Sequence, residues 1–140
     1  MINLAIFISG RGSNAQNIIK YFHSHSKIQV KLVASSNSKS SLIHTIDSPI
    51  NVQVYKKKDF LDGKKILMEL KKNNISFIIL AGFLLKIPTI IINTFNNRIL
   101  NIHPSLLPEF GGKGMYGMNV HYAVFRAKKK ETGITIHEVN

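Results

Sequence analysis

Residues 3–14 read NLAIFISGRGSN, and this stretch decides the fold. Residues 3–8 form a short apolar run of the kind that becomes a buried strand, and a Gly-x-Gly turn follows. From Ala15 onward the apolar residues recur at the spacing of one helix face, at Ile18, Ile19 and Phe22. The stretch therefore predicts a strand, a glycine turn and a helix in succession.

The remainder of the chain repeats this alternation. Apolar, β-rich runs predict strands at residues 30–34, 52–55, 75–80, 98–102 and 133–139. Helical spacing predicts helices at residues 42–47, 60–73, 88–93 and 119–127, with Asp59 as the N-cap of the second and Pro88 in the first turn of the third. Strands that alternate with helices form a parallel-type sheet covered on both faces. We therefore predict an α/β protein with a Rossmann-like, doubly wound, mostly parallel sheet of about six strands, built as a single domain over residues 1–140.

The composition excludes several classes of site. The chain has 140 residues and no cysteine, so it has no disulfide, no thiolate nucleophile and no cysteine metal site. No apolar run reaches the roughly 18 residues that span a bilayer, and the first residues lack the features of a secretory signal. We expect a cytoplasmic protein with no membrane partner.

The net charge of +12 comes mainly from lysine, with 16 Lys against 3 Arg. The guanidinium group of arginine binds phosphates and bases through two parallel hydrogen bonds, which lysine cannot do. This balance therefore does not favour a specific nucleic-acid partner. We interpret the lysine runs at 56–58 and 128–130 as solvated surface. The charge still raises the local concentration of phosphate-bearing small molecules.

The turn at residues 10–14 is a candidate phosphate site. In doubly wound folds ligands bind beyond the carboxyl ends of the strands, and the start of the following helix offers free N–H groups to an anion. The third glycine of the dinucleotide-binding fingerprint is absent, and residues 34–37 read ASSN without an acidic residue to hold a ribose. A nicotinamide cofactor is therefore not expected. The alternative interpretation is a simple tight turn.

A second candidate lies at residues 101–108, which read NIHPSLLP. Asn101 and His103 are two apart at the end of a predicted strand, so their side chains project to one face. An amide can stabilise a developing oxyanion, and an imidazole can move a proton near neutral pH. The pair favours acyl transfer, although a purely structural histidine is the alternative.

Three motifs in this order and spacing resemble the signature of the phosphoribosylglycinamide formyltransferase family: ISGRGSN at 8–14, LAGF at 80–83 and NIHPSLLP at 101–108. FGGKGMYG at 110–117 resembles a loop variant of one branch of that family. The resemblance implies the formyltransferase fold and a folate-dependent formyltransferase without a metal. Such an enzyme transfers a formyl group from its co-substrate 10-formyltetrahydrofolate to the amine of glycinamide ribonucleotide in purine biosynthesis.

The same resemblance assigns roles to eight residues: catalytic Asn101 and His103, phosphate-binding Gly12, Ser13 and Asn14, and folate-binding Leu84, Leu85 and Lys86. Family members often carry Met-Arg where this chain has Leu84-Leu85. His137 matches a histidine of the family's sixth strand, where we expect support and not catalysis.

The family's third catalytic residue is an aspartate in a loop just after the sixth strand, and this sequence ends at Asn140, before that loop. We therefore expect a C-terminally truncated domain with impaired activity, because the aspartate orients and charges the histidine.

Three alternatives remain at this point. A methionyl-tRNA formyltransferase has a Gly-Thr-Pro type turn in place of residues 10–14 and an added tRNA-binding domain. A formyltetrahydrofolate deformylase carries an N-terminal regulatory domain. The third alternative is not an enzyme but a non-catalytic nucleotide-binding remnant.

Overall fold

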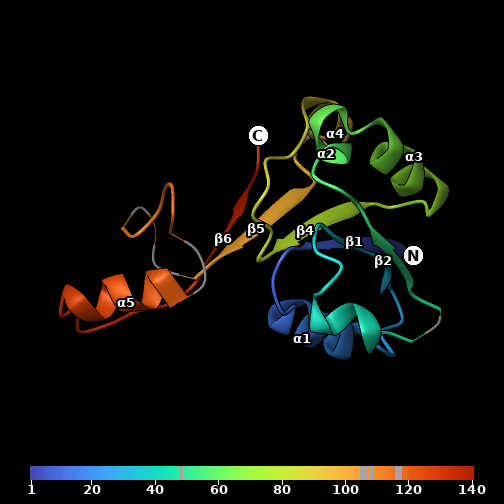
Figure 1. The fold of residues 1–140 in the computed structure, drawn as a ribbon. Helices are drawn as coiled ribbons and strands as arrows, with labels where there is room; N and C mark the ends of the chain where they lie inside the picture. The colour runs from blue at the N-terminus through green and yellow to red at the C-terminus, as the bar shows by residue number, and fades with distance from the viewer. Residues whose placement is uncertain (48, 105–106, 108, 116–117) are drawn as a thin grey trace.

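The computed structural model describes residues 1–47, 49–104, 107, 109–115 and 118–140. Its centre is a sheet in the order β3-β2-β1-β4-β5-β6, in which the first five strands run parallel and β6 pairs antiparallel with β5 (Figure 1). The strands are β1 (Ile2–Ile8), β2 (Ile28–Ser35), β3 (Asn51–Val54), β4 (Phe77–Ala81), β5 (Ile99–His103) and β6 (Thr135–Glu138). The predicted doubly wound, mostly parallel α/β sheet is confirmed.

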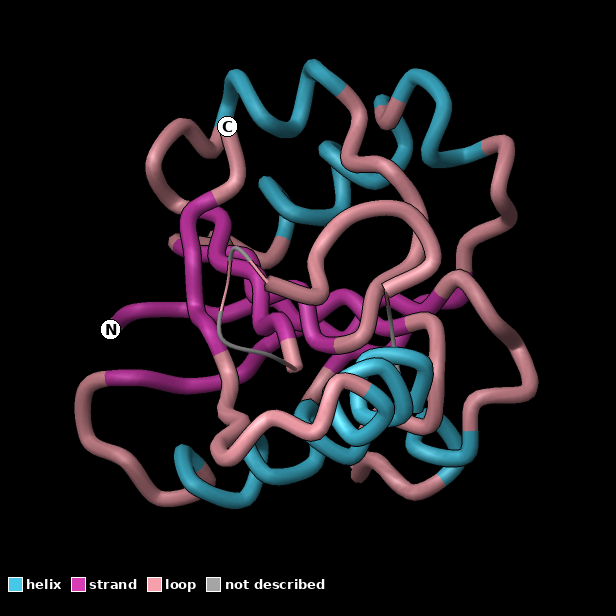
Figure 2. The backbone as a smooth tube through the Cα atoms, turned by 90° about the vertical axis from the view of Figure 1, so that its left-hand side faces the viewer, coloured by secondary structure: helices cyan, strands magenta, loops and turns pink. Residues whose placement is uncertain are grey.

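Helices cover the sheet on both sides, and Figure 2 shows the strands between two groups of them. On one face lie α1 (Ser13–Phe22) and the short 3-10 helix η1 (Ser41–His44). On the other lie α2 (Asp59–Asp62), α3 (Lys64–Lys72) and α4 (Thr89–Thr94). The helix α5 (Met118–Arg126) projects beyond the end of the sheet that β5 and β6 form (Figure 1). Among the described residues, no helix is both long enough and apolar enough to cross a membrane.

The two faces bury separate apolar clusters. Phe7, Ile78 and Leu70 belong to the cluster beneath α2, α3 and α4, whereas Ile6 and Ala15 belong to the cluster beneath α1. β1 contributes to both clusters because successive side chains of a strand point to opposite faces. A strand covered on both faces must be apolar throughout, which is why residues 4–8 show no alternation.

Helix boundaries differ from the sequence prediction, most of all in the first half of the chain. The helix predicted at 60–73 is two helices, because Gly63 has a φ of 77° and a Cβ there would lie 2.8 Å from Pro88. Asp59 is the first residue of α2 and not its cap, and its carboxylate accepts the Lys56 N–H at 2.9 Å. The helix predicted at 42–47 is reduced to η1, and α1 begins at Ser13, two residues before Ala15.

Parts of two sequence motifs lie outside the described residues. They are Ser105, Leu106 and Pro108 of the 101–108 motif, and Tyr116 and Gly117 of the 110–117 motif.

Leu70 tests the packing of the larger cluster. Its side chain is fully buried, so Leu70→Ala should lower the free energy of unfolding by about 2–5 kcal/mol through lost burial and a residual cavity. Leu61, 78% exposed, is the matched control, and Leu61→Ala should change stability by no more than about 0.5 kcal/mol. Urea unfolding measures both, and equal midpoints would contradict the assigned core.

Candidate functional site

Three connections meet at one edge of the sheet because β1, β4 and β5 are parallel neighbours. In register, Phe7 pairs with Leu80 and Leu80 pairs with Asn101. Neighbouring strands are about 4.8 Å apart, so β1 and β5 are separated by about 10 Å. The phosphate-loop candidate that follows β1 and the Asn-x-His pair that ends β5 therefore lie within the reach of one nucleotide.

The phosphate loop, residues 10–14, turns at Gly12. Gly12 has φ 83° and ψ 26°, and a Cβ there would lie 2.6 Å from Cδ2 of the buried Leu42. A Cβ added at Gly10 would have no heavy atom within 4 Å. The turn therefore requires a glycine at position 12 and not at position 10. Within residues 1–47, all of which are described, no side chain caps the start of α1 and no acidic residue lies in its first turn. The first N–H groups of α1 and its positive dipole end are thus available to an anion.

The carbonyl side of the phosphate loop is held by residues that follow β2. The Asn37 amide donates to the Ser9 carbonyl at 3.3 Å, and the Ser40 hydroxyl donates to the Gly10 carbonyl at 2.6 Å. Ser40 is only 3% exposed, so this bond is shielded from water. The sequence did not predict a role for these residues. The pattern that marks them is a group of small polar residues directly after the apolar strand β2.

Asn101 is oriented by His137 across the β5–β6 ladder, where the two residues are register partners. The Nδ2 of Asn101 lies 3.0 Å from Nε2 of His137, and Nδ1 of His137 lies 3.1 Å from the Glu138 carbonyl oxygen. A carbonyl only accepts, so in neutral His137 the proton sits on Nδ1 and Nε2 accepts from Asn101. His137 therefore contacts Asn101, as expected of a supporting residue.

His103 is the last residue of β5, and its Nε2 lies 3.0 Å from the carbonyl oxygen of Phe110. Since a carbonyl cannot donate, this contact places a proton on Nε2. Phe110 has a φ of 57°, a conformation that a bulky side chain rarely adopts. Backbone outliers of this kind collect where the surroundings hold a functional group in place.

The residues of the candidate folate segment, 84–86, differ in their surroundings. Leu85 and Lys86 line a cavity of about 280 Å³ together with Lys57 and Phe60, but Leu84 does not line it. Leu84 is 54% exposed. The preceding turn is anchored by Phe83, whose ring centroid lies 5.5 Å from that of Phe7 and 5.1 Å from that of Phe60.

Tyr55 packs against Phe60, with ring centroids 6.1 Å apart. Burial raises the pKa of Tyr55 to about 12, and the negative charges of Glu69 and Asp59 add to the shift. Tyr55 is therefore protonated at neutral pH, and its place below the folate segment is that of a packing residue.

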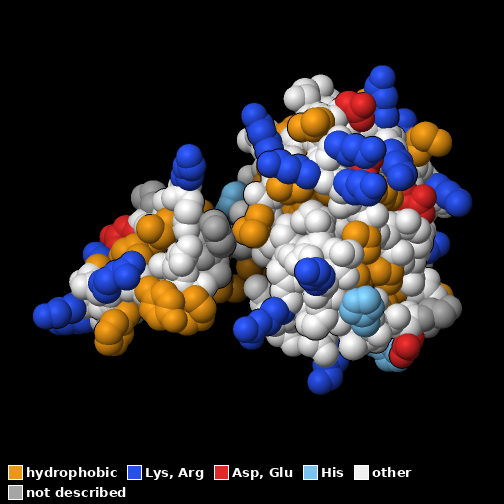
Figure 3. All heavy atoms as spheres, in the orientation of Figure 1, with side chains coloured by type: hydrophobic (Ala, Val, Ile, Leu, Met, Phe, Trp, Pro, Cys, Tyr) orange, Lys and Arg blue, Asp and Glu red, His pale blue; other side chains and the backbone are white. Residues whose placement is uncertain are grey.

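Positively charged side chains lie near the candidate folate segment, at the α2 and α3 end of the molecule. Figure 3 shows Lys and Arg side chains over the α2 and α3 end of the molecule, where Lys57, Lys64 and Lys65 are exposed. Within the part of the chain that the structure describes, no group of three or more His, Cys, Asp or Glu side chains is arranged to hold a metal.

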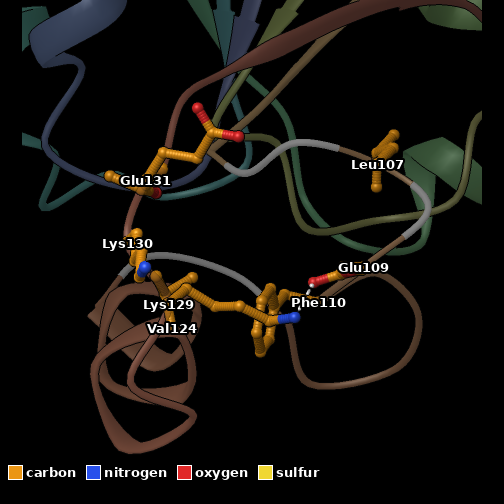
Figure 4. A pocket seen from close by; sticks show the side chains of 8 residues that line it. Leu107, Glu109, Phe110, Val124, Lys129, Lys130 and Glu131 are labelled. Atoms are coloured by element: carbon orange, nitrogen blue, oxygen red, sulfur yellow. Dashed lines mark ion pairs between the residues drawn. The ribbon is translucent and has the colours of Figure 1, made fainter.

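A further cavity of about 360 Å³ lies between the loop after β5 and the end of α5 (Figure 4). It is lined by Leu107, Glu109, Phe110, Val124, Lys129, Lys130, Glu131 and Thr132. Lys129 and Glu109 form an ion pair at 3.1 Å across it, and both are well exposed, so the pair adds little stability. The lining contains none of the eight predicted residues, but it includes Phe110, whose carbonyl oxygen contacts His103.

The family model described as formyl transferase matches residues 2–140. The chain belongs to the formyl transferase family. The chloroplastic phosphoribosylglycinamide formyltransferase of Arabidopsis thaliana is 39% identical over 144 residues, covering 98% of this chain and 49% of that protein. The corresponding Vigna unguiculata protein is 40% identical, covering 98% and 46%. This formyl transferase chain thus spans about half the length of the plant relatives.

Solved structures give the same result. Glycinamide ribonucleotide transformylase 1 of Geobacillus kaustophilus matches with a TM-score of 0.86 and 32% identity, covering 100% of this chain and 75% of that one. The phosphoribosylglycinamide formyltransferase of Anaplasma phagocytophilum matches with a TM-score of 0.85 and 31% identity, covering 99% and 64%. The family resemblance of the three motifs is confirmed. A formyltetrahydrofolate deformylase of Pseudomonas syringae, 17% identical with a TM-score of 0.81, shows a shared fold alone.

The two glycines of the phosphate loop make a matched pair. Gly12→Ala should lower the free energy of unfolding by about 1–3 kcal/mol, because the new Cβ meets Leu42 and the backbone is left-handed. Gly10→Ala places its Cβ in open space and should change stability by no more than about 0.5–1 kcal/mol. Urea unfolding compares them, and a Gly12→Ala variant as stable as Gly10→Ala would refute the described turn.

Proposed function

We propose that this protein transfers the formyl group of 10-formyltetrahydrofolate to the amine of glycinamide ribonucleotide, a step of purine nucleotide synthesis. The observation that carries the proposal is the shared edge of β1, β4 and β5, which gathers the phosphate loop, the folate segment and the Asn101–His103 pair. The names of the plant and bacterial relatives support the same substrates.

Each substrate has a place at this edge. The phosphate of glycinamide ribonucleotide binds the N–H groups at Gly12, Ser13 and Asn14, where α1 presents an uncapped start. Folate bears carboxylates, and the cavity lined by Leu85 and Lys86 also holds Lys57. Lysines beside an apolar wall attract an anionic ligand that also carries an aromatic ring.

The transfer is direct. The glycinamide nitrogen attacks the formyl carbon, a C–N bond forms, and the carbonyl becomes a tetrahedral oxyanion. Asn101, and His103 when it carries the transferred proton, stabilise this oxyanion, and collapse breaks the bond between the formyl carbon and the folate nitrogen. The proton lost by the attacking nitrogen reaches the folate nitrogen through His103 or water. Contact between amine and formyl group, held in place by both sites, supplies much of the rate.

The proposed partners are these two small molecules, and the proposed location is the cytoplasm. The acceptor can be tested directly with a labelled formyl donor, offering glycinamide ribonucleotide and methionyl-tRNA in parallel. We expect label in the ribonucleotide only. Label in the tRNA alone would replace this proposal with the tRNA enzyme.

Removal of either member of the pair should be costly. In the natural full-length protein, Asn101→Ala and His103→Ala should each lower kcat by about 10²–10³-fold, since one oxyanion donor contributes about 2.7–4 kcal/mol. The matched controls are Asn96→Ala and His23→Ala, which change exposed residues that precede β5 and follow the last turn of α1, and both should leave kcat unaltered. Steady-state kinetics measure all four. Turnover near the wild-type value in both test variants would remove the catalytic assignment.

A further inference from the structure

We propose that Ser9 is a positioning residue that couples the phosphate loop to the folate segment and so sets the separation of the two substrates. The inference deepens the proposed function and rests on it. Ser9 directly follows β1 and precedes the first glycine of the phosphate loop. It is only 8% exposed, and every polar group it carries is bonded to another connection at this edge.

Two of these bonds hold the turn after β4. The Ser9 N–H donates to the Gly82 carbonyl at 3.1 Å, and the Ser9 Oγ accepts the Leu84 N–H at 3.0 Å. Together they bracket Phe83, the residue directly before the folate segment. The two segments are more than 70 residues apart in sequence, yet a single side chain spans them.

The remaining bonds hold Ser9 itself from the other side. Its hydroxyl lies 2.6 Å from the Ser36 hydroxyl, and its carbonyl accepts from the Asn37 side chain at 3.3 Å. The Ser36 N–H also donates to the Ile8 carbonyl at 3.0 Å. Ser9 is therefore clamped between the connections that follow β2 and β4, and any displacement of its hydroxyl is shared by both.

The loss of this hydroxyl should move the turn and not unfold the protein. The Leu84 side chain is 54% exposed, so an unpaired Leu84 N–H can rotate toward water at the cost of the turn's position. Phe83 keeps its contacts with Phe7 and Phe60 and holds the turn loosely in place. The loss of the hydroxyl therefore affects the alignment of the two substrates. A misplacement of about 1 Å lowers the rate roughly 10²-fold.

The chain supplies a matched control at the opposite edge. The Ser76 Oγ accepts the Asn3 N–H at 3.1 Å, and the Ser76 N–H donates to the Asn3 carbonyl at 2.7 Å. Ser76 thus joins the β1 and β4 segments through the same pair of bonds as Ser9, but at the amino ends of the strands, far from both substrates. If Ser9 had only a structural role, Ser9→Ala and Ser76→Ala would both lower stability and leave kcat unchanged.

The experiment compares Ser9→Ala, Ser9→Thr and Ser76→Ala in the natural full-length protein. We expect Ser9→Ala to lower kcat by about 10–100-fold and to raise KM for the folate more than KM for the ribonucleotide. Hydrogen exchange of the Leu84 amide should accelerate in the same variant. Ser9→Thr keeps the Oγ acceptor and should restore both kcat and Leu84 protection to within about threefold. Ser76→Ala should lower the melting temperature without changing kcat or the Leu84 amide.

The outcomes separate the inference from the proposed function. If the wild-type protein transfers formyl groups and Ser9→Ala retains the kcat of Ser76→Ala, the inference is wrong and the function stands. If the wild-type protein transfers none, the function is wrong and the inference falls with it. Should Ser9→Ala not fold, Ser9→Cys keeps the side-chain volume with a weaker acceptor, and an unchanged kcat in that variant would overturn the inference.

Discussion

The parallel pairing of β1 with β4 and of β4 with β5 is the constraint on which the site depends. Parallel strands end at the same edge, so the three connections that follow them are brought together whatever their separation in sequence. The pairing is stable because side chains such as Phe7 and Ile78 are fully buried. The apolar core that makes the sheet thus also places the polar loops.

The polar loops at this edge need internal partners because they are partly withdrawn from water. Among the described residues, the buried polar side chains are Ser9, Ser35 and Ser40, and each is hydrogen-bonded there. A buried hydroxyl without a partner is costly, so these bonds constrain the geometry of the loops. The carbonyl groups of the phosphate loop are held by the protein, while the start of α1 stays open to an anion. In the proposed function the phosphate is therefore bound by backbone N–H groups, with serine and asparagine side chains supporting the loop.

The family and the order of strands and helices were predictable because both depend on short, local sequence patterns. Residues 4–8 and 77–80 are apolar throughout, and the motifs at 8–14, 80–83 and 101–108 lie at strand ends. The break at Gly63 was not predictable, because helical spacing continues through it. It follows from the left-handed backbone of Gly63 and its contact with Pro88, at the start of α4.

The sequence by itself determined the alternation of strands and helices, the edge at which the candidate site residues gather and the residue types on which the proposed acyl transfer rests. Only the tertiary structure decided which side chains meet there. The Ser9 hydroxyl reaches Leu84, and the Asn101 amide reaches His137, through strand registers that join residues distant in the chain. Local spacing reports which face a side chain occupies, but contacts across strands depend on register and twist. These are set by the packing of the whole sheet, which no single stretch of sequence contains.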